Sequence, residues 1–286
     1  MMMRLATPYY VLSLLTLPFT HVAARSVNVD VVAPRSGTAT SGTVWATPHD
    51  SYSSSVGVLG CKVDTDRIAY WPGSVDCNNI CLSLRYGDRS VKLLRIDSSQ
   101  GAYDISYDAW NYLITGYPAT ERPTAGGATA MEFEYLKPSA CSGLIHTDGH
   151  KLPLSASNSI NFLASCLDQS DSWVAENYVL YNIQDALCSW GHDEKCDLDW
   201  PNANQPNCSH TLGDPTALTT DPVYNIRYPS GDKVVASSGD VVSVGGEPID
   251  SDTGSSCAGK PVPRLLDMPA VVATISLVTY HLLAFS

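Results

Sequence analysis

The sequence predicts a mainly β protein that carries a helical, disulfide-linked extension toward its C-terminus. Residues 81–97 alternate apolar and polar side chains on both sides of Gly87-Asp88, which is typical of two strands joined by a tight turn. Residues 155–190 instead place apolar side chains at helical spacing, and four cysteines occur between Cys166 and Cys208. The strands therefore come first and the helical part follows.

Residues 1–24 are predicted to be a secretory signal peptide. Arg4 precedes an apolar run at 11–19, and small residues at 22–24 fit a cleavage site. The apolar run is too short to span a bilayer. We therefore expect the mature chain to begin after Ala24 in an oxidising compartment.

The C-terminal end is predicted to be a glycolipid-anchor signal. Residues 268–286 are apolar, and they follow a polar spacer and a cluster of small residues at 254–258. Attachment is expected at Ser256, with removal of residues 257–286. A single-pass membrane helix is the alternative, but no basic cluster follows the run.

The cysteine count agrees with this processing. Of 9 cysteines, Cys257 would leave with the removed tail, so 9 − 1 = 8 remain. We expect these eight to form four disulfides, whose connectivity the sequence leaves open. Asn207 begins the sequon Asn207-Cys208-Ser209 and is the predicted N-glycosylation site. The predicted disulfide cysteines are Cys61, Cys77, Cys81, Cys141, Cys166, Cys188, Cys196 and Cys208.

The charge of the chain limits its ligands. A net charge of −12 and a pI near 4.8 argue against nucleic acid, heparin-like polymers and anionic lipid surfaces, and they are compatible with a neutral polymer. His146 and His150 have the spacing of metal ligands on a helix, but no third ligand is indicated. We predict no metal and no cofactor.

The chain divides into segments of different composition between its two ends. Residues 25–55 are rich in Ser, Thr, Gly and Pro and are expected to be a flexible arm. Residues 56–141 form the predicted β domain, and residues 142–210 the helical Cys-rich extension. Residues 211–256 contain short strand-like pieces and a stalk.

A short helix is expected inside the β domain after Asp104. Ser106 can cap its start, Trp110 belongs to its apolar face and Gly116 can end it. In the structural interpretation, Asp104 only caps this helix or bonds the loop backbone. In the functional interpretation, the same carboxyl lies partly shielded at a strand-to-helix junction, which raises the pKa toward useful acid strength.

Four segments occur in an order that resembles one family. They are RIAYWPG (67–73), YGDRSVKLLRID (86–97), YDIS followed by AW (103–110) and GGATAMEFEYLKPSAC (126–141). In this order they resemble the first strand, the hairpin, the aspartate-bearing segment and the closing strand of the double-psi β-barrel. This barrel is shared by expansins, barwin-type plant proteins, the bacterial lipoprotein RlpA and a small family of endoglucanases. The resemblance implies a double-psi β-barrel over residues 56–141.

The resemblance also implies a polysaccharide groove. Asp104 matches the aspartate that is the proton donor in the endoglucanases and lines the groove in expansins, and Asp97 matches a second groove aspartate. The endoglucanases place their base directly after a Tyr-Trp pair in the first strand, but Pro72 follows Tyr70-Trp71 here, so the hydrolytic pair is incomplete. The predicted ring-stacking residues are Tyr70, Trp71 and Tyr103.

Three functions follow from these observations. The first is an extracellular, glycolipid-anchored surface protein of fungal type that binds a wall polysaccharide, a neutral glucan or chitin, and loosens or remodels it without hydrolysis. The alternative is an endoglucanase-like or lytic hydrolase with Asp104 as general acid. The third is a non-catalytic structural or host-contact protein. In all three, contact with a membrane is expected only through the lipid anchor.

Overall fold

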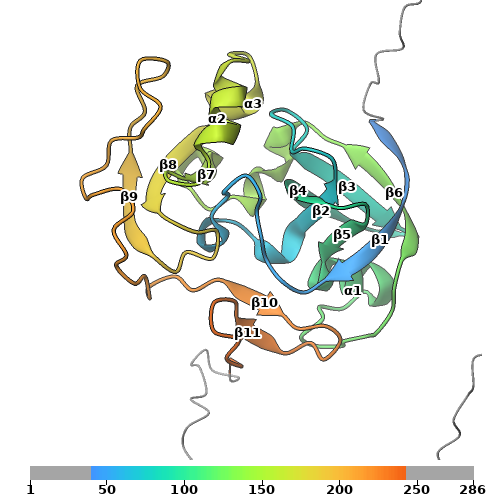
Figure 1. The fold of residues 1–286 in the computed structure, drawn as a ribbon. Helices are drawn as coiled ribbons and strands as arrows, with labels where there is room; N and C mark the ends of the chain where they lie inside the picture. The colour runs from blue at the N-terminus through green and yellow to red at the C-terminus, as the bar shows by residue number, and fades with distance from the viewer. Residues whose placement is uncertain (1–39, 243–286) are drawn as a thin grey trace, which may run out of the picture. The chain divides into compact units, whose positions relative to one another are not determined.

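A closed barrel of six strands forms the first part of the described residues. This computed structural model describes residues 40–242 (Figure 1). Around the barrel the strands follow the order β1-β5-β2-β4-β3-β6, with β6 returning to β1. The pairs β1–β5 and β2–β4 are parallel and the other pairs are antiparallel. The strands are β1 (Ser41–His49), β2 (Ile68–Pro72), β3 (Cys81–Tyr86), β4 (Arg89–Ser99), β5 (Tyr103–Ser106) and β6 (Thr129–Tyr135).

The first strand of the barrel lies within the predicted flexible arm. Strand β1 pairs with β6 and β5, so the barrel begins at Ser41 and not at residue 56. The segment RIAYWPG, expected to be the first strand, contains the second strand, β2. Val44 and Ala46 of β1 point into the barrel interior and are buried there, while Trp45 between them is exposed. The burial of these two apolar side chains stabilises the Ser/Thr-rich segment as a strand.

The hairpin and the helix form where the sequence predicts them. Strands β3 and β4 pair around Gly87, which has a φ of 61°, although β4 continues past Asp97. Helix α1 (Tyr107–Thr115) ends at Gly116 in the left-handed region. Ser106 occupies the predicted N-cap position of α1, but its side chain makes no capping hydrogen bond, because its hydroxyl donates to the carbonyl of Thr65 (2.7 Å).

The extension is mixed rather than helical. A three-stranded sheet, β7-β8-β9, is flanked by two short helices (Figure 1). Strands β10 and β11 form a separate two-stranded sheet and correspond to the predicted short strands. The remaining strands and α-helices are β7 (Leu152–Ser155), α2 (Ile160–Leu167), α3 (Trp173–Glu176), β8 (Tyr178–Ile183), β9 (Gly191–Cys196), β10 (Tyr224–Ile226) and β11 (Lys233–Val235). The 3-10 helices are η1 (Gly60–Lys62), η2 (Thr65–Arg67), η3 (Pro138–Leu144) and η4 (Asp148–His150).

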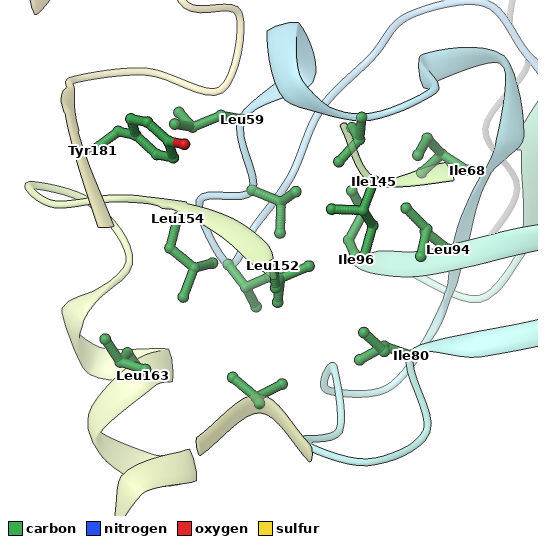
Figure 2. Close-up of a cluster of buried hydrophobic side chains, with 14 of the residues drawn as sticks. Leu59, Ile68, Ile80, Leu94, Ile96, Ile145, Leu152, Leu154, Leu163 and Tyr181 are labelled. Carbon is green, nitrogen blue, oxygen red and sulfur yellow. The ribbon is translucent and has the colours of Figure 1, made fainter. Parts of the chain in front are cut away.

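Two hydrophobic cores lie on opposite sides of the barrel wall. The first fills the barrel interior and includes Trp71 of β2 and Trp110 of α1. The second lies between the outer surface of β2 and β4 and the extension, where Ile68 and Leu94 share one cluster with Leu154 (Figure 2). The extension therefore covers part of the outer surface of the barrel.

Four disulfides connect the eight predicted cysteines. Cys81–Cys141 lies within the β domain, and Cys196–Cys208 lies within the extension. Cys61–Cys188 and Cys77–Cys166 join the two parts. In residues 40–242, no helix is long and apolar enough to cross a membrane. The predicted signal peptide, Ser256 and Cys257 lie outside the described residues.

Candidate functional site

Strand pairing brings the two predicted aspartates to either side of one tyrosine. Tyr70 of β2 is in register with Asp104 of β5 on one side and with Asp97 of β4 on the other. Residues opposite each other in neighbouring strands point to the same face of a sheet. The three predicted site residues therefore gather on the outer surface of β5, β2 and β4.

Asp97 is buried on this surface. Its side chain accepts hydrogen bonds from the hydroxyl of Ser53 (2.6 Å) and from the backbone N–H groups of Ser55 (2.9 Å) and Ser98 (2.7 Å). Only 7% of Asp97 is exposed. Its carboxylate holds the segment at Ser53–Ser55 against the barrel, so the predicted role of Asp97 in an open groove is wrong.

The two rings predicted to stack on sugar are buried. Tyr70 and Trp71 are 4% and 2% exposed. Burial raises the pKa of Tyr70, whose ring lies 4.5 Å from that of His49. Trp71 points into the barrel, where its ring meets that of Tyr103 edge-on at 5.2 Å. Neither Tyr70 nor Trp71 presents a face to a polymer, so their predicted stacking role is wrong, and Tyr103 remains half-buried.

Asp104 remains accessible. It lies in β5 and is partly exposed, and it accepts a hydrogen bond from the hydroxyl of Thr47 in the adjacent strand β1. This hydrogen bond orients the carboxylate on the outer surface. The plain helix-cap interpretation of Asp104 is wrong, because α1 begins three residues later and Asp104 itself belongs to a strand.

Sequence reasoning missed an exposed tryptophan beside Asp104. Trp45 is 64% exposed and precedes Thr47 by two residues in β1, so both side chains point outward. Its partner in β6 is Ala130, a small residue that leaves the ring face open. The sequence did contain a signal for this exposure. The apolar residues Val44 and Ala46 flank Trp45, so a strand that buries both of them turns Trp45 to the outside.

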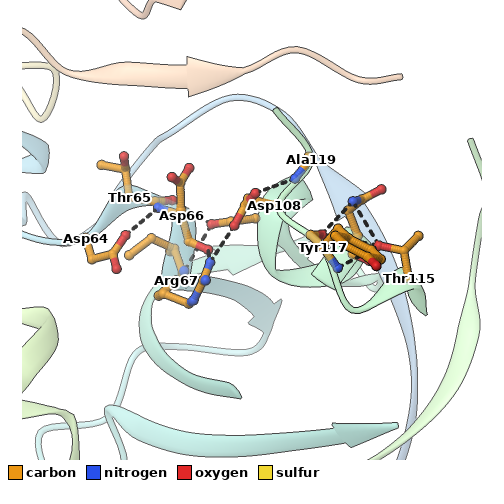
Figure 3. Close-up of polar contacts among 11 residues, drawn as sticks. Asp64, Thr65, Asp66, Arg67, Asp108, Thr115, Tyr117 and Ala119 are labelled. Carbon is orange, nitrogen blue, oxygen red and sulfur yellow. Dashed lines mark hydrogen bonds and ion pairs between the residues drawn. The ribbon is translucent and has the colours of Figure 1, made fainter. Parts of the chain in front are cut away.

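Asp66 and Asp108 belong to a second group of acidic side chains, which lies between η2 and the first turn of α1 (Figure 3). The carboxylate of Asp108 pairs with Arg67 (2.9 Å) and accepts the backbone N–H of Ala119 (2.6 Å). Burial, and next the negative charge of Asp108, raise the pKa of Asp66 to about 7. The void beside Asp66 measures only about 10 Å³ and is lined partly by residues of β10. This cluster has no room for a ligand.

Asp50 is the carboxylate that directly follows the first strand. It accepts the backbone N–H of Tyr228 (3.0 Å) and the hydroxyl of Ser51 (3.3 Å). The backbone of the segment around Tyr228 therefore holds Asp50 beside the end of β1.

The other predicted sites lie apart from this surface. Asn207 is exposed beside the Cys196–Cys208 disulfide in the extension. His150 bonds the carbonyl of Ile145 (2.9 Å) through Nδ1. Among the described residues, no group of three or more His, Cys, Asp or Glu side chains is arranged to hold a metal ion.

No family model, curated protein or solved structure matches this chain. The candidate site is therefore defined by its own geometry. It is the outer surface of β1 and β5, and its members are Trp45, Thr47 and Asp104.

Proposed function

We propose that this protein is an extracellular, glycolipid-anchored protein that binds a wall polysaccharide without hydrolysing it, through a barrel of the double-psi type. Two parallel strand pairs within one closed six-stranded barrel support the barrel type. The four disulfides favour an oxidising compartment outside the cell. The ligand class is a neutral glucan or chitin.

The observation that carries the proposal is the exposed ring of Trp45 beside the Thr47–Asp104 pair. An open indole face offers a large apolar surface on which a sugar ring can stack. The carboxylate and the hydroxyl, two residues further along β1, offer an acceptor and a donor for sugar hydroxyls. One stacking face with adjacent polar groups is an arrangement that orients a sugar without reacting with it.

Hydrolysis is disfavoured because Asp97, the carboxylate predicted to act with Asp104, is buried. An inverting glycosidase needs two carboxyl groups about 6.5–9.5 Å apart with room for a water between them. Asp97, the predicted partner of Asp104, is buried and accepts three hydrogen bonds. We therefore expect Asp104 to form hydrogen bonds with the sugar and not to take part in acid–base catalysis.

A retention assay on insoluble β-glucan, cellulose and chitin tests this proposal. The wild type should remain on at least one polymer, and Trp45→Ala should lose most of that retention. Trp190→Ala is the matched control, because Trp190 is also exposed (47%) but lies in the extension. Equal retention of wild type and Trp45→Ala would refute the role of this surface, and no retention on any polymer would favour a structural or host-contact protein.

A glycan hydrolase with Asp104 as general acid is the second candidate function, because Asp104 is a partly exposed carboxylate on the outer surface of the barrel. New reducing ends that disappear in Asp104→Asn would establish this function in place of simple binding.

A further inference from the structure

The outward side chains of β1 form a row longer than the candidate site. Ser41 and Thr43 precede Trp45 in this row, and Thr47 follows it. Inward residues such as Val44 separate them, so the four side chains share one face. From Ser41 to Thr47 the row measures about 20 Å at about 3.3 Å per residue. The Trp45–Asp104 site occupies only one end of it.

The other end of the row joins a polar face formed by β1, β6 and β3, called here the β1–β6–β3 face. Glu134 lies beside Ser41, and Glu132 beside Thr43. Arg85 of β3 pairs with Glu132 at 2.6 Å, and more than half of each side chain is exposed. A hollow of about 590 Å³ lies over this face. The members of the face are Ser41, Thr43, Ser83, Arg85, Glu132 and Glu134.

The charges on this face and directly beside it are balanced. Arg85 pairs with Glu132, and Lys92 of β4 adds the positive charge that balances Glu134, because both lie next to Ser83. Such a face does not attract a polyanion or a polycation strongly, because the opposite charges cancel within a Debye length. Hydroxyl, carboxylate and guanidinium groups offer both donors and acceptors, which suits a ligand that is neutral and rich in hydroxyl groups.

We propose that the β1–β6–β3 face is a second binding surface for the same neutral polysaccharide, so that one linear chain lies along β1 and contacts both this face and the Trp45–Asp104 site. This inference rests on the proposed function and adds to it. Trp45 supplies the stacking face, Asp104 bonds the sugar on one side, and Arg85 with Glu132 bonds sugars on the other side. The affinity should therefore depend on the length of the chain.

A ladder of soluble oligosaccharides tests this length dependence. Isothermal titration with β-linked glucose and N-acetylglucosamine oligomers, from the disaccharide to the hexasaccharide, is carried out on the full chain. We expect the affinity to rise about tenfold from the disaccharide to the hexasaccharide, because the longer chains add one or two hydrogen bonds to the β1–β6–β3 face. The double variant Arg85→Ala/Glu132→Ala should lose this rise and keep the affinity for the disaccharide.

The control removes a comparable ion pair elsewhere. Lys195 and Asp148 both lie in the extension and form an ion pair at 3.1 Å, and their side chains are also exposed. Lys195→Ala/Asp148→Ala should bind every oligomer like the wild type. Affinity that is the same for all lengths, or a rise that survives in Arg85→Ala/Glu132→Ala, would overturn this inference and leave the proposed function in place. No binding of any oligomer would overturn both.

Discussion

Asp66 makes the stability of the fold depend on pH in a direction that can be worked out. Burial and the neighbouring charge of Asp108 raise its pKa from 3.8 to about 7 in the folded protein. Between these two pH values the unfolded chain has released the proton while the folded protein retains it. The contribution of Asp66 to the free energy of unfolding is therefore highest below about pH 4, falls as the pH rises, and reaches its lower level above about pH 7.

The size of this loss follows from the same numbers. A rise of the pKa from 3.8 to about 7 corresponds to at most about 4 kcal/mol, at about 1.4 kcal/mol per unit. Since Asp66 retains some contact with solvent, we expect about 2–4 kcal/mol. Asp66→Asn removes the ionisable group, so this variant should be more stable than the wild type at pH 8 and similar to it at pH 4.

Urea unfolding at a series of pH values from 4 to 8 measures this difference. The quantity to follow is the free energy of unfolding of Asp66→Asn minus that of the wild type, because other titrating groups cancel in it. Asp88→Asn is the control, since the Asp88 side chain is 92% exposed and should not change the pH dependence. A difference that stays constant across this pH range would refute the assignment of a raised pKa to Asp66.

Three further substitutions test how the fold is held together. Asp97→Ala should lower the free energy of unfolding by about 2–4 kcal/mol in denaturant, because three donors lose their acceptor; a loss below about 0.5 kcal/mol would contradict the role given to it. Gly126→Ala should cost about 1–3 kcal/mol, because its Cβ would lie 2.2 Å from a buried tryptophan ring, whereas Gly127→Ala meets nothing within 4 Å and should be neutral. Cys77→Ala/Cys166→Ala should lower stability by about 2–4 kcal/mol in thermal unfolding, and an unchanged midpoint would show that this link between the two parts contributes little.

Local signals allowed the hairpin and the helix to be predicted. The alternation over residues 81–96 needs only neighbouring residues to be recognised, and Gly87 and Gly116 both adopt the positive φ expected of them. Each of these features is encoded within a few residues of the place where it forms. Boundaries set by more distant contacts, such as the end of β4 beyond Asp97, were missed.

Strand β1 could not be found in this way because its partners are distant. It pairs with β5 and β6, more than fifty residues further along the chain, and its own composition is that of a linker. Strand β8 was missed for a different reason. Leu180 to Ile183 are all buried, so this segment lacks the alternation of apolar and polar side chains that identifies a half-buried strand.

The sequence predicted which residues of the candidate site share a surface, but not which of them are accessible to solvent. The order of strands does place Asp97 and Asp104 on the same surface, on either side of Tyr70. Whether each is accessible depends on the segment at Ser53–Ser55 and on the extension, neither of which has a recognisable pattern for covering a barrel. Accessibility is a property of the whole fold, so residue identity and spacing alone could not reveal it.

The second core explains why the open surface lies at β1. Ile68 and Leu94 make the outer surface of β2 and β4 apolar, and such a surface is stable in water only when it is covered. The extension and the residues around Tyr52 cover it, and Cys77–Cys166 fixes this arrangement. The outward side chains of β1 are instead mostly hydroxyl groups, so this strand can remain uncovered. Trp45 is the exception among them, and an exposed ring in an otherwise polar row is the feature that binding of a ligand would explain.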